Sequence, residues 1–197
     1  MRSVALCLLF VAACQSATRN VTVLVNFEKP HSDVSVMAMR HELRELLEPA
    51  GIAVEVMLKT EMPASPQFSE LFVFAMKGWC SMNAMPAISN VRGPLGLAFS
   101  SNGEILHFGE VECDRVRQCL QRVVGSGRPQ DHQAEFGAAL GIVVAHEIYH
   151  MIVGAKEHTK DGLTKESLSA HELLDGELYL PATVREALMR EFASNHP

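Results

Sequence analysis

Three histidines and a glutamate between residues 146 and 158 could form a catalytic metal site. The stretch reads HEIYHMIVGAKEH. On an α-helix, positions four apart differ by about 40° around the axis, so His146 and His150 would present both imidazoles on one face. That spacing lets two ring nitrogens bind one zinc ion. Glu147 would lie on the same side, so the pattern predicts two zinc ligands and a general base that takes a proton from a metal-bound water.

A catalytic zinc ion needs three protein ligands and one open position, so the helix alone is insufficient. Gly154 is well placed to end the helix, because glycine readily adopts the left-handed conformation that reverses the chain. His158 follows on the returning segment, and we predict that it is the third ligand. The alternative is a glutamate from a downstream segment, and the candidates are Glu166, Glu172 and Glu177.

The apolar surroundings of the motif argue against an accidental cluster. Residues 141–153 read GIVVAHEIYHMIV, and buried histidines and glutamates are costly there unless a partner compensates them. Ile148 and Tyr149 project away from the histidine face, so we expect them to pack in the core. The segment HELLD, with His171 and Asp175 four residues apart, resembles the motif but is short and polar. We expect it to be a surface turn of helix.

The elements that position the motif can be predicted from hydrophobic periodicity and from turn residues. A long loop is expected at 78–94, and the segment 126–132 is expected to separate two helices. Strands are predicted at 20–28, 52–60 and 70–76, with a hairpin formed by 95–100 and 105–111. Helices are predicted at 32–51, 114–125 and 133–153, followed by a loop and a terminal helix at 182–193 behind Pro181. This order describes an α+β domain without internal repeats.

The bulk composition limits the functional classes. The chain has 197 residues, of which 48% are apolar and 20% charged, so it can bury a core. The net charge is −6 and no run of Lys or Arg occurs, so no nucleic-acid partner is expected. Residues 18–197 are predicted to form a single catalytic domain.

The N-terminal segment has the pattern of an export signal. Residues 1–17 contain an apolar run too short to span a bilayer comfortably, followed by small residues. Cleavage near Ala17 would give a soluble protein that is secreted or periplasmic in a bacterium. Alternatively, the sequence VAAC resembles a bacterial lipobox, so that residues 1–13 would be the signal and a lipid on Cys14 would anchor the protein to a membrane. No other apolar run is expected to form a transmembrane helix.

Export implies a compartment in which disulfides form. Beyond the signal the cysteines are Cys80, Cys113 and Cys119, which allow one disulfide and one thiol outside it. Cys80 could pair with either of the other two. No C-x-x-C pair is present, so a cysteine-rich zinc site is not expected.

The motif resembles that of the metzincin-like zincin metallopeptidases. Metzincins have H-E-x-x-H-x-x-G-x-x-H, and each gap around the glycine is one residue longer here. The longer form, H-E-x-x-H-x-x-x-G-x-x-x-H, is similar to a group of small exported bacterial zinc peptidases. The similarity extends upstream through LGLAF and downstream through SLSAHELLDGELYLPATVREAL, so it covers most of the chain beyond the signal.

The resemblance implies a zincin-like fold: a twisted mixed sheet of about five strands packed by two long helices, the second carrying the motif, and a small C-terminal helical part. It also implies an edge strand above the zinc, Leu97 to Ser100, that aligns an extended peptide. By position it makes His146, His150 and His158 the zinc ligands and Glu147 the general base.

One departure concerns the turn beneath the metal, where metzincins place a methionine. The corresponding stretch here is DGLTKES, with Leu163 and Thr164 and no methionine. Tyr179 is a candidate donor to the transition state. The leading hypothesis is an exported Zn²⁺-dependent hydrolase, an endopeptidase rather than an exopeptidase, acting on peptides or proteins. The alternatives are a catalytically inactive zinc- or peptide-binding module on the same fold and a structural exported domain without metal.

Overall fold

The computed structural model describes residues 18–83, 92–121, 123–124, 128–176 and 178–194. The predicted signal segment lies outside the described residues, including both cleavage alternatives and the lipidation site Cys14. Glu177, one of the alternative third ligands, also lies outside them.

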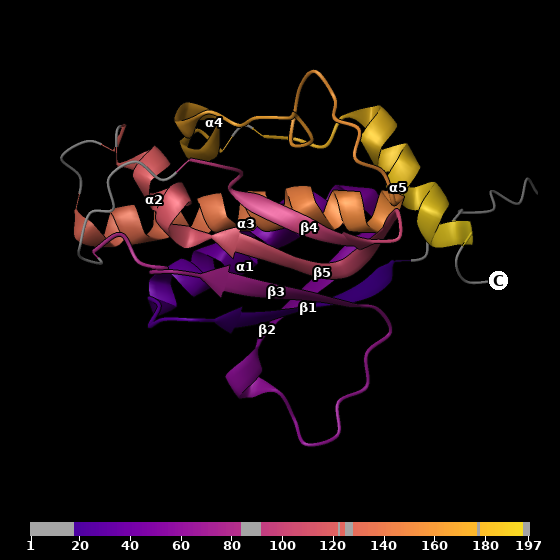
Figure 1. Cartoon of the computed structure of the whole chain (residues 1–197), viewed down its shortest axis with the longest axis horizontal. Coiled ribbons are helices and arrows are strands. Elements are labelled where there is room, and N and C mark those ends of the chain that lie inside the picture. The colour runs from indigo at the N-terminus through magenta and orange to yellow at the C-terminus, as the bar shows by residue number, and fades with distance from the viewer. Residues whose placement is uncertain (1–17, 84–91, 122, 125–127, 177, 195–197) are drawn as a thin grey trace, which may run out of the picture.

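A five-stranded mixed sheet forms the centre of the structure (Figure 1). Its order is β2-β1-β3-β5-β4. The first four strands in this order are parallel to one another, and β4 at the edge is antiparallel to β5. The predicted mixed sheet of about five strands is therefore confirmed. The strands are β1 (Arg19–Phe27), β2 (Ile52–Leu58), β3 (Leu71–Lys77), β4 (Gly96–Ser101) and β5 (Glu104–Glu112).

Two long helices, α1 (Asp33–Leu47) and α3 (Pro129–Val153), lie side by side on one face of this sheet (Figure 1). Alternate strand residues face them and form the core. Those of β1 and β3 are Val21, Val23, Val25, Phe72, Phe74 and Met76. Gly137 of α3 touches the α1 backbone so closely that a Cβ there would lie 2.2 Å from the carbonyl oxygen of Ser35. The missing side chain thus lets the two helices approach and fixes α3 against the core.

The prediction for the start of α3 was wrong. The helix begins at Pro129, inside the segment expected to be a break, because proline is favoured in the first turn of a helix. The resulting 25-residue helix is long and apolar enough to cross a membrane by length and composition alone, contrary to the expectation for this part of the chain. However, 83% of its most apolar stretch is buried within the protein, as in the central helix of a core.

The remaining helices are shorter than α1 and α3. The structure has α2 at Cys113–Leu120, which ends earlier than predicted, α4 at Ala170–Leu174 and α5 at Ala182–Ser194. Single 3-10 turns occupy Glu48–Ala50 and Lys59–Glu61. The irregular chain between α3 and α5 passes over α3 on the side of β4 (Figure 1). It contacts the part of α3 that carries the histidine motif through the carbonyl of Leu163.

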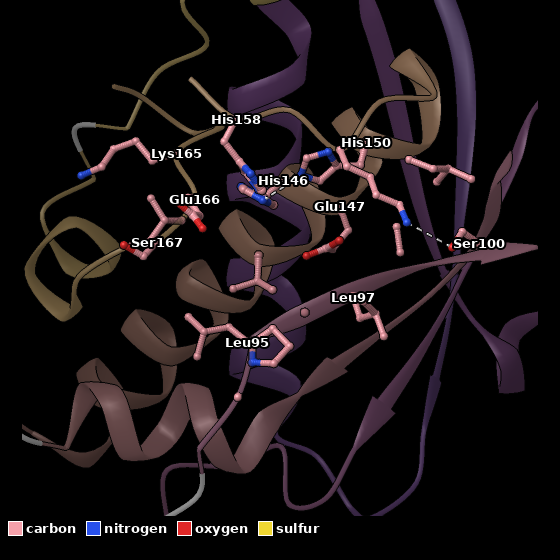
Figure 2. A pocket seen from close by; sticks show the side chains of 18 of the residues that line it. Leu95, Leu97, Ser100, His146, Glu147, His150, His158, Lys165, Glu166 and Ser167 are labelled. Atoms are coloured by element: carbon pink, nitrogen blue, oxygen red, sulfur yellow. Dashed lines mark hydrogen bonds between the residues drawn. The ribbon is translucent and has the colours of Figure 1, made fainter. Parts of the chain in front are cut away.

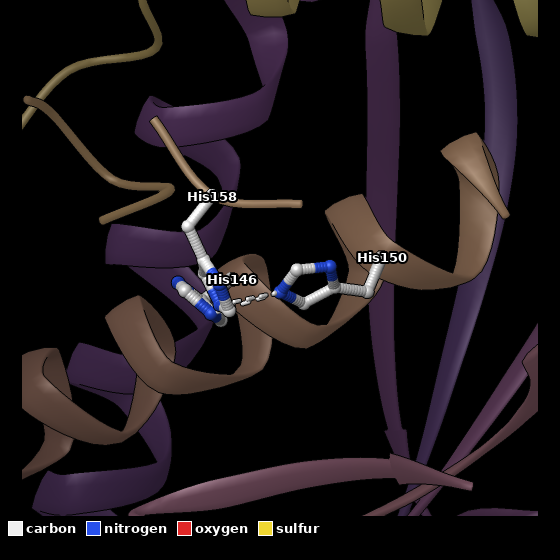
Figure 3. Close-up of side chains that lie close together, drawn as sticks. All are labelled: His146, His150 and His158. Carbon is white, nitrogen blue, oxygen red and sulfur yellow. Dashed lines mark hydrogen bonds between the residues drawn. The ribbon is translucent and has the colours of Figure 1, made fainter. Parts of the chain in front are cut away.

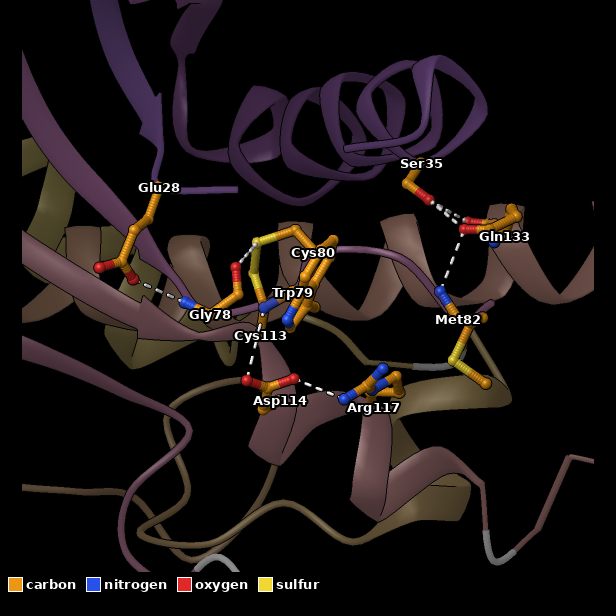
Figure 4. Close-up of a disulfide and its surroundings, with 10 residues drawn as sticks. All are labelled: Glu28, Ser35, Gly78, Trp79, Cys80, Met82, Cys113, Asp114, Arg117 and Gln133. Carbon is orange, nitrogen blue, oxygen red and sulfur yellow. Dashed lines mark hydrogen bonds and ion pairs between the residues drawn. A yellow bond between two sulfur atoms is a disulfide. The ribbon is translucent and has the colours of Figure 1, made fainter. Parts of the chain in front are cut away.

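A disulfide between Cys80 and Cys113 ties the chain after β3 to the start of α2 (Figure 4). The structure thus chooses between the two pairings left open by the sequence, and Cys119 lies half-buried outside this disulfide. Beside it, a buried ion pair links Asp114 and Arg117. Arg115, which follows Asp114 in α2, donates to the carbonyl of Pro94 at 2.7 Å. These contacts hold the segment that leads into the edge strand β4.

Candidate metal centre

Helix α3 brings the first two motif histidines together. His146 and His150 point to the same side of the helix, and their Nε2 atoms are 3.1 Å apart (Figure 3). This is close to the distance between two ligand atoms of a tetrahedral zinc site, whose zinc–nitrogen bonds measure about 2.0–2.1 Å. His150 is buried and His146 is half-buried.

The third histidine arrives after the helix stops. Gly154 has a φ of 65°, in the left-handed region, and its N–H donates to the carbonyl of His150 at 2.9 Å. The chain then turns back and places the Nε2 of His158 at 3.2 Å from the Nε2 of His150. The ligand atoms of all three histidines lie within 4.8 Å of one another. The structure therefore brings together the three residues predicted as zinc ligands.

Two backbone carbonyls orient the helical histidines. The Nδ1 of His146 lies 2.8 Å from the carbonyl oxygen of Leu163, and the Nδ1 of His150 lies 2.7 Å from that of Ala155. A carbonyl can only accept, so each Nδ1 carries the proton and each neutral ring has its lone pair at Nε2. Two such lone pairs face each other at 3.1 Å and cannot form a hydrogen bond with each other. A cation between the rings satisfies both, so the donor set fits a metal ion.

Burial keeps these rings in the form that binds metals. It lowers the pKa of His146 to about 4, although the hydrogen bond to Leu163 acts in the opposite direction. Burial also lowers the pKa of His150. Because a metal binds neutral imidazole, both rings are ready to coordinate at neutral pH without first losing a proton.

Glu147 lies beside the histidines, between α3 and β4 (Figure 2). Burial raises the pKa of its carboxyl group to about 7, and a hydrogen bond with the backbone of Ala98 opposes this rise. The strand can approach because Gly96 has no side chain. A Cβ at that position would lie 2.7 Å from Val143 Cγ1 and 2.9 Å from the Oε1 of Glu147. The side of the Glu147 carboxyl group that faces Gly96 is therefore packed closely against the edge strand.

A cavity of about 630 Å³ opens in front of these groups (Figure 2). The three histidines and Glu147 line one side of it, and β4 lines another through Gly96, Leu97, Ala98 and Ser100. Leu95, Val143 and Leu168 add apolar surface, and the half-buried Cys119 also borders the cavity. The strand predicted to lie beside the metal is thus both the edge of the sheet and a wall of the cavity.

The alternative ligands predicted from downstream glutamates do not join the histidine group in the described residues. Glu166 lines the cavity, but it is exposed. Glu172 forms an ion pair with Lys165. It also forms a capping box with Ser169 at the start of α4. The contact with Lys165 is the main cause that lowers the pKa of Glu172 to about 2.

Other predicted residues lie away from the cavity. Tyr179, the candidate transition-state donor, does not line it. Its hydroxyl donates to Oδ2 of Asp161 at 3.0 Å, so its proton is already used. His171 is exposed on α4, as expected for a surface turn, while Ile148 and Tyr149 are buried in the core. The carbonyls of Leu163 and Ala155 could not have been found from the sequence, since every residue has one.

Comparison with known proteins gives a fold but no family. No protein-family model matches the chain, and no curated protein matches its sequence. Among solved structures, the crystal structure of archaemetzincin from Methanopyrus kandleri is similar, with a TM-score of 0.52 and 12% sequence identity. The match covers 93% of this chain and 99% of that chain. At this identity the similarity shows a shared α+β fold.

Proposed function

We propose that this protein is a zinc-dependent metallopeptidase in which His146, His150 and His158 bind the metal and Glu147 is the general base. One observation carries the proposal: three imidazoles converge beside a buried carboxylate, in a cavity bordered by an edge strand. The similarity of the fold to archaemetzincin supports it.

The residues around the cavity suggest how a peptide bond is cut. Bound zinc would lower the pKa of a water molecule and polarise the scissile carbonyl. Glu147 would take a proton from the attacking water and later deliver it to the leaving amine. The free edge of β4 offers backbone groups that can pair with an extended peptide and hold it across the cavity. Because an edge strand can pair with the middle of a long chain, endopeptidase activity is the form we propose.

We further propose that the protein is exported and works as one domain, residues 18–197, after removal of residues 1–17. The Cys80–Cys113 disulfide supports an oxidising compartment. Lipidation at Cys14 after removal of residues 1–13 is the alternative form of the same proposal. The mass of the mature N-terminal peptide distinguishes the two. Peptides or proteins are the proposed partners, and the net charge of −6 argues against nucleic acid.

A catalytically inactive zinc- or peptide-binding module is the second candidate. It is motivated by the turn that carries Leu163 in place of a methionine, and by the position of Tyr179 outside the cavity. Both candidates require the metal site, but only the first requires Glu147 to move a proton.

The two candidates separate when zinc-loaded wild type and Glu147→Gln are given an unfolded, labelled protein. We expect the wild type to release fragments and Glu147→Gln to be slower by at least about 100-fold, the usual contribution of a general base. Glu186→Gln is the matched control, since Glu186 is exposed on α5 and should leave the rate unchanged. Zinc content is measured in all three proteins. Equal rates for wild type and Glu147→Gln would refute the peptidase, and zinc binding without any cleavage would favour the inactive module.

A further inference from the structure

We infer that the hydroxyl pair of Thr159 and Thr164 is a positioning device for the metal centre, a role that rests on the proposed zinc site. Thr159 directly follows His158, the third proposed ligand. Thr164 directly follows Leu163, whose carbonyl orients His146. A bond between the two threonines therefore connects the supports of two ligands that are twelve residues apart in the chain.

Two hydrogen bonds, one between backbone groups and one between hydroxyls, join the ends of the loop 159–164. The backbone N–H of Thr159 donates to the carbonyl of Thr164 at 2.9 Å. The two hydroxyl oxygens are 2.6 Å apart, and the hydroxyl of Thr159 also donates to the carbonyl of Asp161 at 2.7 Å. A hydroxyl has one proton, and that of Thr159 is used toward Asp161, so Thr164 must donate to Thr159. The direction of the bond is thus fixed by its neighbours.

Burial makes this bond difficult to replace. Thr164 is 0% exposed, and a buried hydroxyl without a partner costs more than the bond itself contributes. Removing the acceptor on Thr159 would therefore push Thr164 to find another partner and shift the turn. Since Leu163 is also 0% exposed, a shift of the turn would move the carbonyl that binds His146.

The far side of the same loop is fixed to the chain before α5. The N–H of Leu163 donates to the carbonyl of Tyr179 at 2.9 Å. Gly162 has a φ of 72°, and a Cβ there would lie 2.7 Å from the Tyr179 carbonyl oxygen. The hydroxyl of Tyr179 closes the contact by donating to Asp161. Tyr179 thus holds residues 161–163 against the chain before α5. The threonine pair holds the same turn against the residue that follows His158.

His158 depends on this connection more than the other two ligands do. His146 and His150 are part of α3, whereas His158 is exposed and lies in irregular chain. The two threonines touch neither the histidine cavity nor the reacting atoms among the described contacts, so they act by placing other residues. The expected consequence of losing the bond is a looser third ligand and weaker metal binding, with the metal still able to reach the site.

Zinc affinity of Thr164→Val and Thr164→Ser, measured by competition with a chromogenic chelator, tests the inference. Valine has the same shape without the hydroxyl, and serine keeps the hydroxyl. We expect Thr164→Val to bind zinc about 10–100-fold more weakly, the usual effect of losing an outer partner, and serine to restore the affinity to within about threefold. With cobalt in place of zinc, the visible spectrum of Thr164→Val should change and that of Thr164→Ser should match wild type. Thr183→Val, on the exposed surface of α5, is the matched control.

A second variant, Thr159→Val, keeps the test valid if Thr164→Val fails to fold, because Thr159 is only half-buried. It removes the bond from Thr164 together with the donation to Asp161, so it should weaken zinc binding at least as much as Thr164→Val. The double variant should be no weaker than Thr159→Val, because Thr159→Val already removes the bond that Thr164→Val removes. Wild-type affinity and spectrum in both valine variants, or no recovery with serine, would overturn the inference and leave the proposed function intact. Failure of folded wild type to bind zinc would overturn both.

Discussion

The proposed metal centre combines two regions that are built in different ways. Helix α3 contributes His146, Glu147 and His150 from a buried, regular element whose geometry follows from its own hydrogen bonds. The segment from Gly154 to Lys165 contributes His158 and the carbonyl of Leu163 from irregular chain. Helical spacing fixes two ligands and the base through local geometry. The third ligand depends on contacts made by residues that are not ligands.

Removal of one ligand from each region should have the largest effect on zinc affinity. It also tests whether the two regions contribute differently to the stability of the fold. His150→Ala and His158→Ala should both weaken zinc binding by more than the roughly 10–100-fold that loss of an outer partner costs. The metal-free proteins should differ. His150 is buried and donates to Ala155, so His150→Ala should lose about 1–3 kcal/mol of stability toward urea. His158 is exposed, so His158→Ala should stay within about 0.5 kcal/mol of wild type.

Chelator competition and urea unfolding of the metal-free proteins measure these two effects. If His158→Ala bound zinc as tightly as wild type, His158 would not be a ligand, and a glutamate would become the candidate for the third ligand. Equal loss of stability in both variants would instead show that His150 and His158 contribute equally to the free energy of unfolding of the metal-free protein.

The pH dependence of stability tests the helical region alone. In the metal-free protein the pKa of Glu147 is raised from 4.5 to about 7, so the folded state binds more protons than the unfolded chain between these values. The contribution of Glu147 to stability should therefore fall as the pH rises through this window. The lowered pKa of His146 acts in the opposite direction, and the comparison with Glu147→Gln cancels it. At 1.36 kcal/mol for each pH unit, the full penalty above pH 7 is about 3 kcal/mol. Metal-free Glu147→Gln should accordingly be more stable than wild type at pH 8, by up to this amount, and similar to it near pH 4.5.

Urea unfolding of both metal-free proteins across this pH range measures the difference, with Glu186→Gln as an exposed control that should show none. A difference that does not change with pH would mean that Glu147 is not desolvated. The base would then be solvated like an exposed residue, and the helical half would be less preorganised than the structure indicates.

The smallest effect is expected at the junction of the two regions. Nothing lies within 4 Å of a Cβ added to Gly154, so only its left-handed backbone opposes a side chain. Gly154→Ala should cost about 1 kcal/mol and weaken zinc binding slightly, whereas Gly154→Asn should cost less because asparagine tolerates this conformation. Urea unfolding and chelator competition compare the three proteins. Full wild-type stability in Gly154→Ala would show that the helix end does not need the left-handed turn.

The same division explains what the sequence could predict. The positions of His146, Glu147 and His150 follow from helical periodicity, and the helix stop at Gly154 follows from the conformational freedom of glycine. The five strands follow from alternation and turn residues. All of these are local properties of the chain.

Features that depend on distant contacts were not predictable. Cys80 could pair with either of two cysteines, and only the packing of α2 against the chain after β3 selects Cys113. Tyr179 is a candidate donor by residue type alone, whereas in the structure its hydroxyl donates to Asp161. The carbonyl of Leu163 gives no signal in a sequence. The start of α3 was misplaced because Pro129 within a polar segment looked like a break.

The central claim is that both regions hold one zinc ion. A crystal structure of the zinc-loaded protein, with anomalous diffraction recorded on either side of the zinc absorption edge, tests it most directly. We expect one zinc peak per chain at about 2.0–2.1 Å from the Nε2 atoms of His146, His150 and His158, with a water molecule as the fourth ligand near Glu147. A folded protein without a zinc peak among these histidines, or a peak bound only by the two histidines of α3 while His158 points away, would contradict the account.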